Sequence, residues 1–196
     1  MIETTVSLRP EPASPTAPAR APTPAEWRQA MGCFPTGVTI VTTWDDVGDA
    51  LGADVEGGAR PLGRPEPVGS TINAFCSVSL DPPLLLICLD LNNPIRRALE
   101  RTRVFGVNIL CSDSHGMAMR FATDPLTDRF TAFDWGHAEG GAPQLKAAPV
   151  FVDCQVQDIH TAGDHLVIIG RGVGAHVDPA PTPLLYHRGA FPKLGA

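Results

Sequence analysis

The sequence predicts a mainly β protein with short helices, folded as an antiparallel barrel. Short apolar or alternating segments recur from residue 36 to residue 191, and Gly- and Pro-rich turns separate them. They give about six or seven strands and two or three short helices. Strands and helices do not alternate regularly along the chain, and this pattern disfavours a doubly wound parallel sheet.

Composition limits the classes of protein to consider. A length of 196 residues fits one domain, and 43% hydrophobic with 18% charged residues is typical of a globular chain. With 15 basic and 21 acidic residues the net charge is −6, so we expect no nucleic-acid binding. The longest apolar run, residues 84–89, is far shorter than the roughly 20 residues of a membrane-spanning helix. No secretory signal is apparent, so we expect a cytoplasmic protein without a membrane partner.

Residues 1–24 are predicted to form a flexible Pro-rich tail before a domain over residues 25–196. They carry six prolines among Ala, Ser and Thr, and too few large apolar groups to offset the entropy of ordering them. A short helix is expected from Pro24 to about Cys33. Thr23 is its predicted N-cap, with Pro24 at the first helical position and Glu26 in the first turn.

The next two segments are a strand and a long loop. Residues 36–43 alternate and are rich in β-branched side chains, which favours a strand. Residues 46–69 are rich in Gly, Pro and acidic residues, and they are much longer than a usual hairpin loop. This segment is either a functional lid or an inert insertion, and we favour the insertion.

Residues 70–80 are predicted to form one strand with two unlike faces. Ile72, Ala74, Cys76, Val78 and Leu80 alternate with Thr71, Asn73, Phe75, Ser77 and Ser79, so one face is apolar and the other carries hydroxyl and amide groups. The Asp81-Pro82-Pro83 turn ends this strand. Residues 84–90 are apolar enough to form a strand buried on both faces.

A short helix is expected from Asn93 to Glu100, with Asn93 as N-cap and Pro94 at the first helical position. Its N-terminus could hold an anion. The remaining predicted elements are a helix over residues 112–122 and strands over residues 104–110, 150–159, 165–177 and 184–191.

The Gly170-x-Gly172-x-Gly174 pattern follows a predicted strand but does not indicate a dinucleotide site. It lacks the G-x-G-x-x-G spacing, and no amphipathic helix follows it. We interpret it as a bulged or sharply coiled strand.

The cysteines and histidines indicate neither disulfides nor a metal. The five cysteines are an odd number without C-x-x-C spacing, and most of them are expected to be reduced and buried. None is proposed as a nucleophile. The six histidines include no H-E-x-x-H pair, so no metal site is expected.

Five blocks, in this order and approximate spacing, resemble the short-chain flavin reductases of two-component monooxygenases, which have the FMN-binding split barrel fold. They are residues 34–43, 77–84, 105–110, 162–165 and 185–189. The resemblance extends from about residue 26 to the C-terminus. It implies an antiparallel, Greek-key-like split barrel and a homodimer with FMN or FAD in a groove near the subunit interface.

The resemblance also implies an activity. The protein would be an NAD(P)H:flavin oxidoreductase that takes a hydride from NADH or NADPH and supplies reduced flavin, by diffusion, to a separate flavin-dependent monooxygenase. In such enzymes the flavin carries the reactivity, and the protein binds and orients the two partners.

The resemblance assigns two sets of site residues. His165 would be the catalytic residue beside the nicotinamide, together with Asp164, Tyr186 and Arg188. The flavin would be bound by Thr36, Ser70, Thr71, Asn73, Ala74, Phe75, Cys76, Asn92, Asn93, Asn108, Ile109, Arg129 and Phe130. Within this set Asn92 and Asn93 would hold the phosphate, while Arg129 and Phe130 would close over the ribityl or adenylate end.

The chain departs from the family pattern at two places. Ala74 stands where a Ser is common, and Asn93-Pro94-Ile95 replaces a Ser-x-Thr pattern. Two other functions therefore stay open: a flavoenzyme acting on its own organic substrate, with residues 46–69 in the substrate pocket, and a non-catalytic flavin- or haem-binding protein. Tight flavin retention with slow NADH oxidation would indicate the first of these, and absence of turnover the second.

Overall fold

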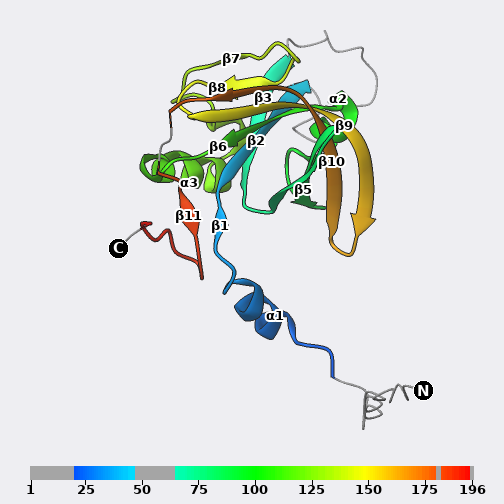
Figure 1. Cartoon of the computed structure of the whole chain (residues 1–196), viewed down its shortest axis with the longest axis vertical. Coiled ribbons are helices and arrows are strands. Elements are labelled where there is room, and N and C mark those ends of the chain that lie inside the picture. The colour runs from blue at the N-terminus through cyan, green and yellow to red at the C-terminus, as the bar shows by residue number, and fades with distance from the viewer. Residues whose placement is uncertain (1–19, 47–64, 180–181, 195–196) are drawn as a thin grey trace, which may run out of the picture.

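The computed structural model describes residues 20–46, 65–179 and 182–194, and its centre is a strongly curled antiparallel sheet (Figure 1). The seven strands lie in the order β3-β2-β6-β9-β10-β5-β4. Their bounds are β2 Thr39–Asp46, β3 Pro65–Ile72, β4 Phe75–Leu80, β5 Pro83–Asp90, β6 Val104–Ile109, β9 Val150–Ala162 and β10 His165–Val177. The predicted antiparallel, mainly β fold is confirmed.

The sheet forms a split barrel because β3 and β4 follow each other in the chain but occupy its two opposite edges. Asn73 and Ala74 join these edges, so the edges must approach each other at this point. The prediction of one strand over residues 70–80 is therefore wrong. The predicted apolar face is also wrong beyond Ala74, since Val78 is 49% and Leu80 96% exposed on the edge strand β4.

Two apolar clusters hold the barrel together. One lies between the curled strands and includes Ile87, Phe105 and Ile168, each 0% exposed. The other lies between the sheet and α3 (His115–Thr123), where Phe121 is fully buried. Burying such side chains stabilises a fold by roughly 1.5–3 kcal/mol each. Both clusters keep β3 in a fixed position, because α3 packs on it from one side and the barrel core from the other.

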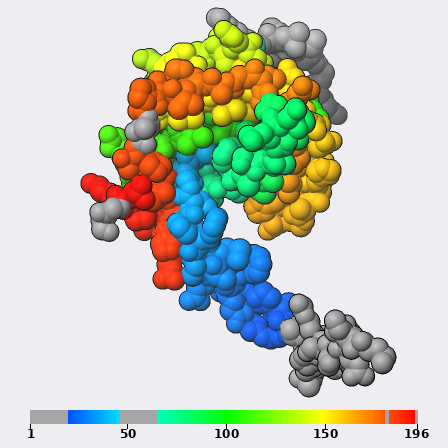
Figure 2. All heavy atoms as spheres, in the orientation of Figure 1, coloured from blue at the N-terminus to red at the C-terminus, as the bar shows by residue number. Residues whose placement is uncertain are grey.

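Helix α1 (Pro24–Met31) begins as predicted. Thr23 and Glu26 form a reciprocal capping box, in which the Glu26 N–H donates to Thr23 Oγ1 at 3.3 Å and the Thr23 N–H donates to Glu26 Oε2 at 2.7 Å. No residue of α1 is buried, and Figures 1 and 2 show the helix projecting away from the barrel. Residues 1–19 of the predicted tail lie outside the described residues.

The predicted strand over residues 36–43 is divided at Val38. Its first part, β1 (Thr36–Gly37), pairs with β11 (Leu185–Tyr186) apart from the main sheet. The strand predicted over residues 184–191 is therefore limited to β11. It stops there because the chain turns back at once, with Arg188 at φ 49° and Gly189 at φ 79°.

The predicted loop over residues 46–69 is shorter than expected, because β3 begins at Pro65 and pairs with β2 up to Asp46. Pro65 and Pro67 are compatible with β3 because it is an edge strand. Residues 47–64 lie outside the described residues.

The helix predicted from Asn93 starts later. α2 (Arg96–Thr102) has Ile95 as its N-cap, and the Asn93 side chain makes a local turn instead, accepting from the Ile95 N–H at 3.1 Å. β5 is buried on one face only, with Leu85, Ile87 and Leu89 inside, so the prediction of two buried faces is wrong.

Strands β6, β9 and β10 and helix α3 lie close to their predicted positions. No pattern in the sequence indicates the short pair β7 (Trp135–His137) and β8 (Pro143–Leu145). The ladder between β9 and β10 shifts register beside Gly170, where Gln157 of β9 is unpaired in this ladder, and again at Val173 of β10, between Gly172 and Gly174. The bulge of β10 at Val173 confirms the interpretation of the glycine pattern.

All five cysteines are free, but only Cys154 is buried, so the expectation of mostly buried thiols is wrong. Cys33 and Cys76 are exposed because they lie on the projecting N-terminal segment and on the edge strand β4. Burial raises the pKa of the Cys154 thiol to about 12, so this side chain stays a protonated part of the core. Within the described residues, no helix is long and apolar enough to cross a membrane.

Candidate functional site

A groove of about 1080 Å³ lies where α1, β1, β11 and the β3–β4 junction meet. Five of the predicted site residues line it from segments far apart in the sequence: Thr36, Asn73, Ala74, Tyr186 and Arg188. Arg188 and Gly189 border it from the turn after β11, and the remaining lining residues are Arg28, Gln29, Met31, Gly32 and Phe34. The fold thus brings predicted flavin residues and predicted nicotinamide residues into one groove.

The junction between β3 and β4 lines this groove and carries two backbone N–H groups that lie outside the strand ladders. The backbone N–H groups of Asn73 and Ala74 have no acceptor among the residues that the structure describes, because they lie between the two strands and belong to neither ladder. The Asn73 side chain donates to Thr36 Oγ1 at 3.1 Å, which ties the junction to β1. Two adjacent unpaired N–H groups suit an electron-rich oxygen or nitrogen of a planar ligand.

A second cavity of about 380 Å³ shares Asn73, Tyr186 and Gly189 with the groove and extends under α3. Met119 and Phe191 line its apolar side. Thr71 also lines it, but its hydroxyl donates to the Ala118 carbonyl at 2.6 Å and so contributes to the packing of α3 on β3.

Arg188 fixes the base of α1 to the turn after β11. Its backbone N–H donates to the Gly32 carbonyl at 3.1 Å, and its Nη2 donates to Cys33 Sγ at 3.2 Å. Its φ of 49° lies in the left-handed region. A cationic side chain is thereby held at the rim of the groove.

A second group of predicted flavin residues lies on the far side of β3, toward α2. Ser70 is 5% exposed and its hydroxyl accepts from Asn93 Nδ2 at 3.1 Å. Asn92 is exposed beside it, and its backbone N–H donates to Asp90 Oδ1 at 2.6 Å. Phe75 packs against the barrel core, and Cys76 lies exposed next to it on β4.

Asn108 is engaged entirely by the fold. It is 0% exposed, donates to the Ile40 carbonyl and to Thr42 Oγ1, and accepts from the Leu145 N–H at 2.9 Å. We therefore assign it a structural role. Ile109, beside it on β6, packs against the barrel core.

Arg129 and Phe130 are buried in the segment after α3. Arg129 Nη1 donates to the Gly69 carbonyl at 2.7 Å and covers the free edge of β3, and burial lowers the pKa of its guanidinium. Phe130 packs on Phe121 with ring centroids 4.9 Å apart. Neither residue lines the groove at the β3–β4 junction.

His165 and Asp164 lie at the turn between β9 and β10, which Figure 1 places well away from β11. His165 Nδ1 and Asp164 Oδ1 are 2.7 Å apart, and this hydrogen bond lowers the pKa of Asp164. The Leu91 N–H donates to the Asp164 carbonyl, so the turn adjoins residues 91–95. One chain therefore does not bring His165 together with Tyr186 and Arg188.

The α1 residues Arg28, Gln29 and Met31 were not predicted as part of the site. The sequence indicates their helix, but its position beside the groove depends on the Arg188 contacts, which no local pattern encodes. In the described part of the chain, no three His, Cys, Asp or Glu side chains gather as a metal site.

Comparison with known proteins identifies relatives of this chain. It is 37% identical over 168 residues to the reductase subunit of stachydrine N-demethylase from Rhizobium meliloti, covering 86% of this chain and 65% of that protein. It is 33% identical to the reductase subunit of a flavin-dependent monooxygenase from Rhodococcus jostii, covering 88% and 79%. The chain spans only about half to two thirds of the length of two curated relatives from Rhizobium meliloti.

The solved structures that resemble this chain are also flavin reductases. The NADH:FAD oxidoreductase of Streptomyces globisporus C-1027 superposes with a TM-score of 0.74 at 32% identity, covering 92% of this chain and all of that one. The same protein solved with NAD and FAD fragments gives a TM-score of 0.73. The sequence model of one protein family, described as the flavin reductase like domain, matches residues 31–195. Since that match spans most of the sequence, this chain belongs to the flavin reductase-like domain family.

Proposed function

We propose that this protein is an NADH-dependent flavin reductase that reduces FMN or FAD and releases it to a separate flavin-dependent monooxygenase. The observation that carries the proposal is the groove at the β3–β4 junction. There Asn73 and Ala74, whose backbone N–H groups have no acceptor in the described part of the chain, share one groove with Tyr186 and Arg188.

The groove suits a flavin in chemistry and in size. When bound, a flavin accepts a hydride from a reduced nicotinamide, so the protein has to bind and align two planar rings. Unpaired backbone N–H groups can donate to the carbonyl oxygens and ring nitrogens of the flavin, where negative charge develops on reduction. Arg188 places a positive charge where a phosphate of either ligand could reach it.

The relatives support the choice of ligands and of the partner. The Streptomyces globisporus relative is named an NADH-dependent FAD reductase, and another, from Kitasatospora aureofaciens, a flavin reductase that uses NADH. Two further relatives are reductase subunits of monooxygenases or demethylases. NADH as donor and an oxygenase as the recipient of reduced flavin follow from these names by analogy.

We propose a homodimer in which α1 packs on a second copy. Trp27, Met31 and Phe34 are 55%, 52% and 74% exposed, although large apolar side chains are seldom left on a projecting arm. Val78 and Leu80 on the edge strand β4 form a second exposed apolar surface. Such a dimer would also allow the His165 turn of one copy to approach the groove of the other.

Light scattering tests the dimer. The native chain is expected to have about twice the 20.8 kDa of one chain, and Trp27→Ala with Phe34→Ala should shift it toward the monomer. A monomeric wild type that still turns over would contradict the proposed arrangement.

Steady-state NADH oxidation tests the activity. With FMN, FAD and riboflavin added in turn, the rate is expected to rise and saturate with at least one flavin, and to be very low without added flavin. Tight retention of flavin with slow oxidation would favour a flavoenzyme with its own substrate. Binding without any turnover would favour a carrier.

A further inference from the structure

The barrel has a second pocket at the end opposite α1. It has a volume of about 360 Å³ and lies between the end of β2, the start of β3, β7 and the segment that follows α3. Figure 1 shows β7 and the end of β2 on the side of the barrel away from α1. This second pocket shares no lining residue with the groove at the β3–β4 junction, so the two are separate sites.

The lining of this pocket combines carboxylates with aromatic and aliphatic groups. Asp45 and Glu66 supply the charge, Trp135 and Phe130 supply aromatic surface, and the lining residues that the structure describes include no basic side chain. The other lining residues are Pro67, Val68, Leu126, Thr127 and Thr131. A phosphate-bearing ligand such as a flavin nucleotide or NADH would meet the negative charge of Glu66 and the Asp45 carboxylate, which is ion-paired with Arg101.

Asp45 is the most informative residue of this lining. It is only 6% exposed, and its Oδ1 pairs with Arg101 of α2. Its Oδ2 has no donor among the residues that the structure describes. None of the buried side-chain oxygens of the described residues lacks a partner, so Oδ2 is accessible and can accept from a cationic hydrogen-bond donor.

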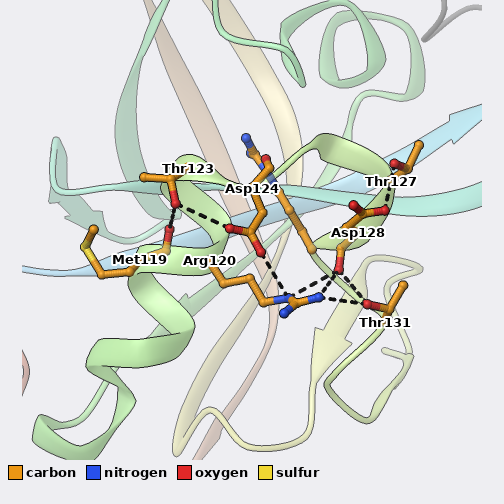
Figure 3. A network of polar contacts seen from close by, with 8 residues as sticks. Met119, Arg120, Thr123, Asp124, Thr127, Asp128 and Thr131 are labelled. Carbon is orange, nitrogen blue, oxygen red and sulfur yellow. Dashed lines mark hydrogen bonds and ion pairs between the residues drawn. The ribbon is translucent and has the colours of Figure 1, made fainter.

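The pocket wall is held in place before any ligand binds. From α3, Arg120 Nη2 donates to the Asp128 carbonyl at 2.8 Å and to Thr131 Oγ1 at 2.9 Å (Figure 3). Arg129, in the same segment, is bonded to Gly69 of β3. Trp135 is held by edge contacts with Trp44 and Phe130, at centroid distances of 5.7 and 6.3 Å. A preformed wall lowers the entropic cost of binding.

We propose that this pocket binds a small organic ammonium ion with an aromatic or aliphatic body. The ammonium group is held by the carboxylates of Asp45 and Glu66, and the apolar body rests against Phe130, Leu126 and Val68. The exposed part of the Trp135 ring, which is 37% exposed overall, adds a cation–π contact. This site is independent of the proposed flavin reduction, because its residues and its charge differ from those of the groove.

Calorimetric titration of the full chain with 2-phenylethylammonium tests the proposal, in the presence of saturating FMN. Binding is expected to be at least about tenfold tighter than that of 2-phenylethanol, which has a similar shape but no charge, and phenylacetate should not bind. Equal binding of amine and alcohol, or no binding of the amine, would overturn the proposal.

Two variants assign the binding to this pocket. Glu66→Gln should weaken amine binding about fivefold, while Asp158→Asn, which removes an exposed charge on β9 outside the pocket, should leave it unchanged. In NMR spectra the Trp135 indole N–H signal should shift on titration and the Trp27 signal should not. Unaltered affinity in Glu66→Gln, or an unmoved Trp135 signal, would refute the site.

Discussion

Among single residues, Ala74 offers a test by gain of function. It lines the groove, and the related reductases that the sequence resembles commonly carry a hydroxyl there. Ala74→Ser adds one donor, and a hydrogen bond contributes about 0.5–1.5 kcal/mol. The Kd for FMN, measured by fluorescence titration, should therefore fall by roughly 2- to 10-fold. Ala132→Ser, at an exposed position outside the groove, should leave the Kd unchanged; equal effects of the two changes would contradict the assignment.

His165 tests whether a second copy completes the site. Within one chain it lies away from the groove, 2.7 Å from Asp164. If the partner brings it to the nicotinamide, His165→Ala should raise KM for NADH and lower kcat by about 10-fold, with an unchanged flavin Kd. Full activity of the variant would make the 163–165 turn structural.

Asp153 links ionisation to stability. It is 2% exposed and accepts from the Gly140 N–H at 2.6 Å. Burial nevertheless raises the pKa of Asp153 more than its hydrogen bonds from backbone N–H groups lower it. The folded state then binds the proton more strongly than the unfolded state, so this group stabilises the fold most below pH 3.8, its ordinary pKa, and less as the pH rises through the raised value. Asp153→Asn lacks this dependence.

Thermal unfolding measured from about pH 3 to pH 7 tests this linkage. The Tm of the wild type relative to Asp153→Asn should decline as the pH rises through that window and then level off. A difference in Tm that grows with pH would show that the pKa of Asp153 is lowered instead.

At the scale of the elements, the curled strand β10 depends on close contact at Gly170. A Cβ at this position would overlap the Phe105 ring in the barrel core. Gly170→Ala should therefore destabilise the fold by about 1–3 kcal/mol, measured by chemical denaturation. Gly37→Ala, where a Cβ would meet no atom within 4 Å, is the matched control. Equal stability of the two variants would contradict the close packing.

The elements also show what the sequence could and could not predict. α1 was predicted correctly because its start is encoded locally by Thr23 and Glu26. The break between β3 and β4 was not, because the alternating pattern runs through Asn73 and Ala74 without interruption and the break follows from barrel closure. Asn93 is a good N-cap residue by type, but its side chain bonds instead to Ser70 on a distant strand.

For the whole molecule, local sequence identified strands and caps, and the resemblance identified the family and five of the eleven described residues that line the groove. The separation of His165 from Tyr186, the burial of Asn108 and the contribution of α1 depend on long-range packing. Such contacts join segments far apart in the sequence, 155 residues apart for Arg188 and Cys33, and no local pattern encodes them.

The central claim, that flavin is a substrate which leaves the protein after reduction, has one direct test. The full chain is mixed anaerobically with excess NADH and a large molar excess of free FMN or FAD, and loss of oxidised flavin absorbance is followed. The account predicts that reduced flavin accumulates to many equivalents per chain. Reduction that stops at one equivalent per chain, or does not occur with either flavin, would contradict it.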